Sequence, residues 1–229
     1  MRPLLTALAL TGLLHTTQAA ADSPVVVELY TSQGCSSCPP ADAFLHELAK
    51  RDDVIALALH VDYWDYIGWK DVFASPQYTA RQHGYAQAAS ATTVYTPQMV
   101  INGQDHVVGS RPRQVMSRVE AHQARVDPVD VSLSRSGSTL QIQAEASARG
   151  DYVVQLVRYS PQETVDIRRG ENAGRQLSYA NVVSSWDVIG QWDGASALDI
   201  SATVSGNDPI VVIVQQARSG PIVGASELR

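Results

Sequence analysis

The residues of this chain best suited to chemistry are Cys35 and Cys38, which are separated by Ser36 and Ser37. They are the only cysteines in the 229 residues, so the chain offers neither of them a distant partner. A disulfide between them closes a very short loop, and a loop of this size removes little entropy from the unfolded chain. The spacing therefore favours redox chemistry over a purely structural cross-link.

The two cysteines lie where an apolar run, residues 25–30, gives way to a turn and then to a helix-like stretch. A helix N-terminus favours the thiolate over the thiol, which makes the first cysteine nucleophilic. We expect Cys35 to be the attacking thiol. Cys38, one turn further on, would be the resolving thiol that releases a mixed disulfide.

Other interpretations of the same pair stay open. The cysteines could form a permanently oxidised, inert disulfide, although an exposed ring of this size is easily reduced. They also supply half of a tetrahedral zinc site, whose other ligands would be His60, Asp62 or another distant group. A carrier of copper or another thiophilic metal would use the same two sulfurs. In a further alternative the protein is a non-catalytic binding module.

The bulk composition excludes some classes of partner. The chain has 17 Lys and Arg against 23 Asp and Glu, a net charge of −6, and no basic run. A nucleic-acid groove or a patch for anionic lipids is therefore not expected. A hydrophobic content of 45% is typical of a folded globular protein.

Residues 1–21 resemble a secretory signal peptide, with Arg2 before a leucine-rich stretch and the small residues Ala19 and Ala21 before a cleavage site at Asp22. The alternative, an uncleaved membrane anchor, is disfavoured because the apolar core is short and rich in threonine. We expect a periplasmic or secreted protein with no membrane span after cleavage, in a compartment where disulfides persist.

The first half of the chain alternates strands and helices. Apolar runs at 25–30 and 54–61 predict buried strands, and helical spacing at 41–50 predicts a helix between them. Such a βαβ unit implies parallel pairing. A proline that enters an extended run at 94–103, followed by Asn-Gly, predicts an antiparallel hairpin.

A helix is expected at 112–124, after which the pattern changes near residue 126. From there apolar and polar residues alternate with a period of two, which is typical of half-buried strands. The expected strands are 129–133, 140–144, 152–159, 164–167, 177–183, 198–202 and 210–216. They predict an antiparallel sandwich-like domain over 127–229, separate from a first domain over 22–126.

The order of these elements resembles the thioredoxin fold. The resemblance implies that Pro97 is the cis-proline that faces the CxxC and that Thr96, before it, pairs with the backbone of a bound substrate. The longer gap before Pro97 implies a helical insertion over 63–91. The expected fold class is thus a thioredoxin-like α/β domain with a helical insertion, followed by an all-β antiparallel sandwich-like domain.

A narrower resemblance rests on the motifs ELYTSQGCSSCPPAD, HVDYWDYIGWKD, YTPQMVING and RRGENAGR. They are similar to a bacterial secreted family of unassigned function, the domain-of-unknown-function family 1223. That resemblance implies a fold and names no substrate.

Thioredoxin also carries a buried acid on its first strand that exchanges a proton with the resolving thiol. Glu28 lies on the corresponding strand, offset by one residue from that spacing. Burial would raise the pKa of its carboxyl group and suit it to acid–base work on Cys38. The alternative is an acid that faces solvent or binds a polar partner.

Together these features predict a thiol–disulfide oxidoreductase-like protein that exchanges disulfides with protein or peptide partners. Its catalytic residues would be Cys35, Cys38, Pro97, Thr96 and Glu28. The sequence shows no flavin or nicotinamide motif, so we expect no cofactor and assign the electron donor or acceptor to another protein.

Overall fold

The computed structural model describes residues 23–229; the predicted signal peptide lies outside this range. The first part of the chain forms β1 (Val25–Thr31), α1 (Pro39–Leu48), β2 (Val54–His60), η1 (Asp65–Ile67), α2 (Pro76–Ala88), β3 (Gln98–Ile101), β4 (Asp105–Val108) and α3 (Pro112–Gln123). The second part forms β5 (Val129–Ser136), β6 (Thr139–Ala146), β7 (Tyr152–Asp166), β8 (Gln176–Trp192), β9 (Leu198–Thr203), β10 (Ile210–Gln216) and β11 (Ile222–Leu228).

The βαβ unit predicted around the CxxC is confirmed. β1 and β2 pair in parallel from Val25 with Val54 to Thr31 with His60, and α1 connects them. Every residue of both strands is buried. Continuous apolar strands of this kind need cover on both faces, and the helices provide it.

The hairpin predicted at Asn102-Gly103 joins β3 to β4. Both turn residues have a positive φ, 44° for Asn102 and 67° for Gly103, the backbone that a two-residue type I′ turn requires. The Asn102 side chain also accepts the backbone N–H of Val26 at 2.7 Å. Because β3 pairs antiparallel with β1, the hairpin extends the same sheet.

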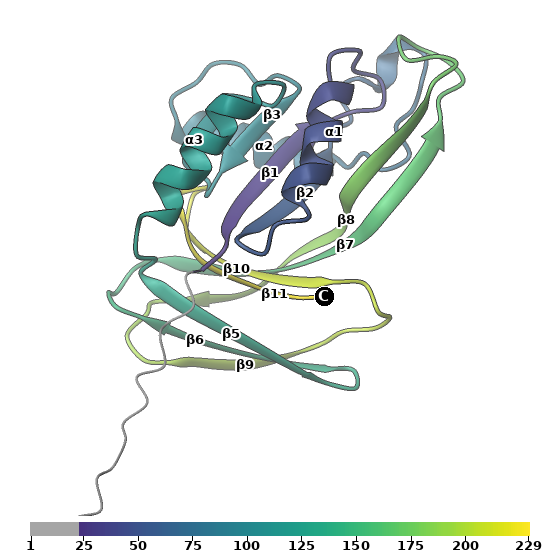
Figure 1. Ribbon diagram of the computed structural model, residues 1–229. Coiled ribbons are helices and arrows are strands. Elements are labelled where there is room, and N and C mark those ends of the chain that lie inside the picture. The colour runs from purple at the N-terminus through teal and green to yellow at the C-terminus, as the bar shows by residue number, and fades with distance from the viewer. Residues whose placement is uncertain (1–22) are drawn as a thin grey trace, which may run out of the picture.

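The two halves of the chain share that sheet. It has eight strands in the order β11-β10-β7-β8-β2-β1-β3-β4 (Figure 1). Ala58 of β2 pairs with Val182 of β8, and the Asn181 side chain donates to the Ala56 carbonyl at 2.8 Å. The predicted fold class, a thioredoxin-like α/β domain plus a separate all-β domain, is therefore wrong. The protein is mostly β, and its halves meet within one large mixed sheet.

The two halves share one sheet because the outer edge of β2 needs a partner strand. β2 is buried along its whole length, so an open edge there would expose unpaired backbone groups beside an apolar surface. β8 covers this edge from far along the sequence. The long hairpin of β7 and β8 also replaces the shorter strands expected at 152–159, 164–167 and 177–183.

A second sheet, in the order β5-β6-β9, packs below part of the large sheet (Figure 1). The alternating pattern predicted these three strands correctly. Their inward residues, such as Val129, Leu140 and Ile142, share a core with Val154 of β7 and Val212 of β10. The sandwich predicted for the second half thus has the large sheet as its other layer.

Helices cover the remaining part of the large sheet on both faces. α1 and α3 pack on one face, where Leu45 and Val115 share a core with Leu29. α2 packs on the other, where Tyr85 shares a core with Tyr30. Consecutive β1 residues alternate between these faces. Within residues 23–229, no helix is long and apolar enough to cross a membrane.

Candidate functional site

Cys35 and Cys38 form a disulfide in the loop between β1 and α1, with their Cα atoms 5.4 Å apart. α1 begins at Pro39, and Cys38 is its N-cap residue. Proline is tolerated at this position because the first N–H groups of a helix have no intrahelical acceptor. The N–H of Cys35 donates to the Ser32 carbonyl and the N–H of Cys38 to the Cys35 carbonyl, so successive turns bring the sulfurs together.

Both cysteines are completely buried, with 0% of their surface exposed. The structure thus differs from the expectation of an exposed ring at a helix start. Only the two serines between the cysteines are exposed in this loop. Two other segments of the chain contact this loop.

The first cover is the aromatic segment around η1. Trp64 and Ile67 pack on Gly34, the residue before Cys35: a Cβ at Gly34 would lie 3.2 Å from Trp64 Cβ and 3.2 Å from Ile67 Cδ1. Trp64 Nε1 also donates to Thr96 Oγ1 at 2.8 Å. The predicted insertion therefore lies against the disulfide loop.

The second cover is the tip of the β7–β8 hairpin. Asn172, 1% exposed, donates through Nδ2 to the carbonyls of Gln33 at 2.9 Å and Cys35 at 3.0 Å. The N–H of Ser36 donates to Glu171 Oε2 at 3.4 Å. The motif RRGENAGR contains Asn172, but no local pattern in the sequence assigns this residue to the disulfide loop.

Pro97 of the predicted Thr96-Pro97 pair lies on the same side of the sheet as α1. Its peptide bond is cis, and the Pro97 carbonyl accepts the N–H of Gly109 at 3.0 Å. A Cβ at Gly109 would lie 3.3 Å from Pro97 Cβ and 3.1 Å from Ala41 Cβ. Pro97 and the first turn of α1 therefore meet around Gly109, and Thr96 joins the site through Trp64.

A buried acid lies in the first turn of α1. Asp42, one helical turn after Cys38, accepts a hydrogen bond from Thr31 Oγ1 at 2.7 Å. Burial raises the pKa of the Asp42 carboxyl group to about 7, against the lowering effect of Thr31. The sequence signal for this acid was its position beside Ala41 and Leu45 on the buried face of the helix.

A second buried acid binds the histidine at the end of β2. Asp71 Oδ2 lies 2.7 Å from His60 Nδ1 and accepts the N–H of Gln33 at 2.7 Å. Burial alone would raise the pKa of Asp71. His60 and the N–H donors of Gln33 and Phe73 outweigh burial and hold that pKa below its usual value. The Asp71 carboxylate therefore fixes the start of the disulfide loop.

Glu28 does not lie with the residues around the disulfide loop. Its carboxylate accepts hydrogen bonds from Tyr30, Arg81 and Tyr85 on the face of the sheet covered by α2. The helix that Cys38 caps packs on the opposite face. The structure therefore does not bring Glu28 to the cysteines, and Asp42 is the buried acid on their side.

The other ligands considered for a metal are engaged elsewhere. His60 binds Asp71, and Asp62 Oδ1 accepts from Thr79 Oγ1 at 2.6 Å. In the described part of the chain, no group of three or more His, Cys, Asp or Glu side chains is arranged to hold a metal. Neither His60 nor Asp62 is therefore free to complete a metal site with the two cysteines.

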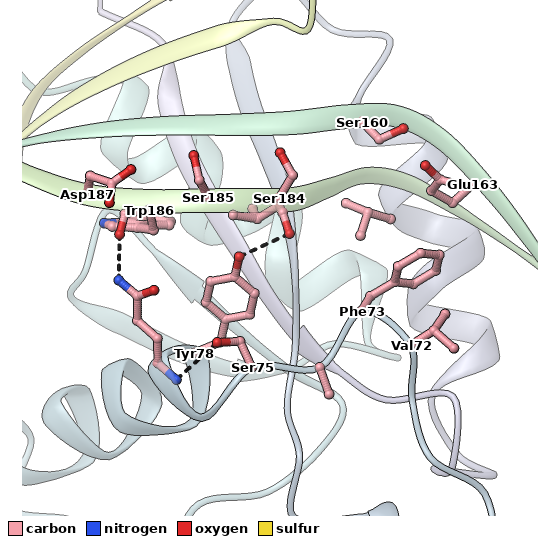
Figure 2. A pocket seen from close by; sticks show the side chains of 14 residues that line it. Val72, Phe73, Ser75, Tyr78, Ser160, Glu163, Ser184, Ser185, Trp186 and Asp187 are labelled. Carbon is pink, nitrogen blue, oxygen red and sulfur yellow. Dashed lines mark hydrogen bonds between the residues drawn. The ribbon is translucent and has the colours of Figure 1, made fainter. Parts of the chain in front are cut away.

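A cavity of about 440 Å³ opens beside β8 and is lined by neither cysteine. Figure 2 shows Tyr78 reaching β8, where its hydroxyl donates to the Val183 carbonyl at 3.1 Å. Glu163 and Asp187 lie among its lining residues. Phe73, also in its wall, meets His60 edge-on at 5.3 Å between ring centroids. The cavity therefore borders the buried histidine and is distinct from the disulfide.

Fold and site together define a mostly-β protein whose mixed sheet carries a buried CxxC disulfide at a helix N-terminus. The chain belongs to the family described as "Protein of unknown function (DUF1223)", whose model matches residues 26–215. The family resemblance in the sequence motifs is thereby confirmed.

Two solved structures are similar to this chain. The chain is 36% identical to a crystallised protein from Agrobacterium tumefaciens, with a TM-score of 0.79, over 92% of this chain and 96% of that one. It is also similar to HBP35 of Porphyromonas gingivalis, with 16% identity and a TM-score of 0.63, over 90% of this chain and 75% of that one. At that identity the second similarity concerns the fold alone. No curated protein matches the sequence.

Proposed function

We propose that this protein exchanges disulfides with protein or peptide thiols through Cys35 and Cys38. The observation that supports the proposal most is the position of the disulfide. It ends at the N-cap of α1, one turn before Asp42, a buried acid with a pKa of about 7. Catalytic acids and bases often have strongly shifted pKa values, and Asp42 lies one helical turn after Cys38.

In the reductive direction, an incoming thiolate attacks Sγ of Cys35. A new sulfur–sulfur bond forms to Cys35, the bond between Cys35 and Cys38 breaks, and its electron pair leaves on Sγ of Cys38. The positive end of the α1 dipole stabilises that thiolate, because Cys38 is the N-cap residue. Asp42 holds a proton below about pH 7 and is the buried acid suited to protonate it.

A second thiolate of the partner then attacks the mixed disulfide at the partner's own sulfur. The partner leaves with a disulfide, and the protein keeps two reduced cysteines. The same steps in reverse transfer a disulfide to the partner. We assign the recharging of the pair to another protein, in the periplasm or outside the cell, because the predicted signal peptide and the disulfide suit an oxidising compartment.

A second candidate is a non-catalytic protein whose disulfide only holds the loop in shape. The complete burial of both sulfurs favours it, because a reactive cysteine is usually partly exposed. The two candidates differ in one measurable property, the reducibility of the native pair.

The test is to equilibrate the mature protein with glutathione buffers and to trap free thiols. We expect a defined midpoint potential. Insulin reduction should then be lost in Cys35→Ser and kept in Ser36→Ala, a matched change at an exposed position of the same loop. A pair that stays oxidised across the whole buffer range would overturn the proposal in favour of the structural role. Copper retained stoichiometrically by the reduced protein, and lost in Cys38→Ser, would indicate a metal carrier.

A further inference from the structure

The tip of the β7–β8 hairpin, residues 167–175, is a small closed loop that presents Asn172. The N–H of Ile167 donates to the Arg175 carbonyl at 2.8 Å, and the N–H of Gly174 to the Ile167 carbonyl at 2.7 Å. Arg175 Nη1 donates to Asn172 Oδ1 at 3.0 Å. The amide of Asn172 is therefore oriented before it contacts the rest of the molecule.

This amide is fastened to the backbone of the disulfide loop. Its nitrogen binds the carbonyls of Gln33 and Cys35, residues that are 139 and 137 positions away in the sequence. Each of these two carbonyls thus already accepts a hydrogen bond from within the protein. In Figure 1 the hairpin rises beside α1 and its tip lies near the loop that precedes this helix.

Further contacts join the tip to the aromatic cover. A Cβ at Gly170 would lie 3.2 Å from Trp69 Cβ, so the two residues are in close contact. Trp69 Nε1 donates to Gln33 Oε1 at 2.8 Å. On the other side of the tip, Glu171 accepts the N–H of Ser36. The tip, the aromatic segment and residues 33–36 are thus joined in one assembly, and Cys35 and Cys38 have no exposed surface.

We propose that the hairpin tip is an autoinhibitory strap, with Asn172 as its latch, that must lift from residues 33–36 before a thiolate can reach Sγ of Cys35. This inference rests on the proposed disulfide exchange. The latch bonds are made to backbone carbonyls and leave the sulfur atoms untouched. We expect the strap to bind the oxidised and the reduced protein equally well. Lifting it then accelerates reduction and reoxidation by the same factor and leaves the reduction potential of the pair unchanged.

The test is the rate at which dithiothreitol, in excess, reduces the pair in the folded full-length protein, followed by trapping free thiols. Asn172→Ala should react about tenfold faster than the wild type. This factor corresponds to a loss of about 1.4 kcal/mol from the free energy that favours the closed strap. Arg175→Met, which removes only the donor that orients Asn172, should show a smaller acceleration in the same direction.

The matched control is Asn181→Gly, because the φ of Asn181 is 47°, a backbone conformation that glycine adopts without strain. Asn181 is also buried and also donates to a backbone carbonyl, that of Ala56, but lies in the sheet. Its rate should stay within about twofold of the wild type, since it removes a comparable bond without touching the strap.

Each other outcome overturns the strap. Equal acceleration in Asn172→Ala and Asn181→Gly would mean general loss of stability. A fast wild type that Asn172→Ala does not accelerate would refute the latch and leave disulfide exchange standing. A shifted reduction potential in Asn172→Ala would mean that the tip stabilises one redox state of the pair more than the other, against the proposed strap. A pair that neither protein allows to be reduced without denaturant would refute the strap and the proposed function together.

Discussion

Arg81 and Glu28 form a two-pronged ion pair inside the protein, with Nε 2.7 Å from Oε2 and Nη2 2.9 Å from Oε1. Glu28 is fully buried, and the guanidinium of Arg81 lies 3.9 Å from the ring centroid of Trp186. Arg81 Nη1 also donates to Gln155 Oε1 at 3.1 Å. Because Gln155 and Trp186 belong to β7 and β8, this one side chain ties α2 and β1 to the second half of the sheet.

Removing Arg81 should destabilise the protein strongly. Arg81→Met leaves the Glu28 carboxylate buried without its cation, and breaking a buried pair in this way costs about 3–5 kcal/mol. The measurement is the free energy of unfolding in urea. Lys50→Met is the control, because the pair of Lys50 and Glu47 is exposed and should contribute less than about 1 kcal/mol. Similar losses in both variants would contradict the assigned role of the buried pair.

The buried acid Asp42 should make stability depend on pH. Its pKa is about 7 in the folded protein and 3.8 in a free chain, so between these values the folded state binds more protons. The contribution of Asp42 to the free energy of unfolding is therefore full below about pH 4 and falls as the pH rises to about 7. Asn cannot ionise. The free energy of unfolding of Asp42→Asn should therefore increase relative to that of the wild type across this window, by roughly 1.4 kcal/mol for each unit of pKa shift.

Urea unfolding of the wild type and of Asp42→Asn at pH 4.5, 6 and 8 measures this difference. Its growth with pH is the expected result. A difference of constant size would show that the carboxyl group is already ionised at low pH in the folded state, against the burial seen here.

The hydrogen bond between Trp64 and Thr96 should be measurable by a double-mutant cycle. Trp64→Phe and Thr96→Val each remove one partner and keep most of the packing. The expected coupling energy in the unfolding free energies is about 1 kcal/mol, the usual net value of such a bond. Strict additivity of the two single changes would mean that the aromatic cover is not fastened to the Thr96-Pro97 segment.

Gly109 should tolerate no side chain. In Gly109→Ala the new methyl group would lie 3.1 Å from Ala41 Cβ and 3.2 Å from Leu29 Cδ1, closer than ordinary contact. We expect a loss of about 1–3 kcal/mol, the usual cost of overpacking. Gly190→Ala is the matched control, since its nearest neighbours would be 3.9 and 4.0 Å away. Thermal or urea unfolding of both variants tests the difference, and equal stability would argue against close packing around Pro97.

Several elements could be predicted because their signals are local. The apolar runs of β1 and β2, the Asn102-Gly103 turn and the alternation in β5, β6 and β9 depend on neighbours in the sequence. The position of Glu28 relative to the cysteines could not be predicted, because it depends on a residue far away in the sequence. The sequence allowed Glu28 to be buried but did not show its partner. Arg81 lies 53 residues away on α2, and no local pattern relates it to Glu28.

By itself the sequence determined the pairing of its two cysteines, the βαβ unit that carries them and the family to which the chain belongs. Only the tertiary structure decided that β8 closes the edge of β2, and hence that one sheet replaces two domains. It also decided that Asn172 binds the backbone of the disulfide loop. The physical reason is that side-chain periodicity records which face of a strand is buried, whereas an edge pairing or a loop contact depends on backbone groups that every residue carries.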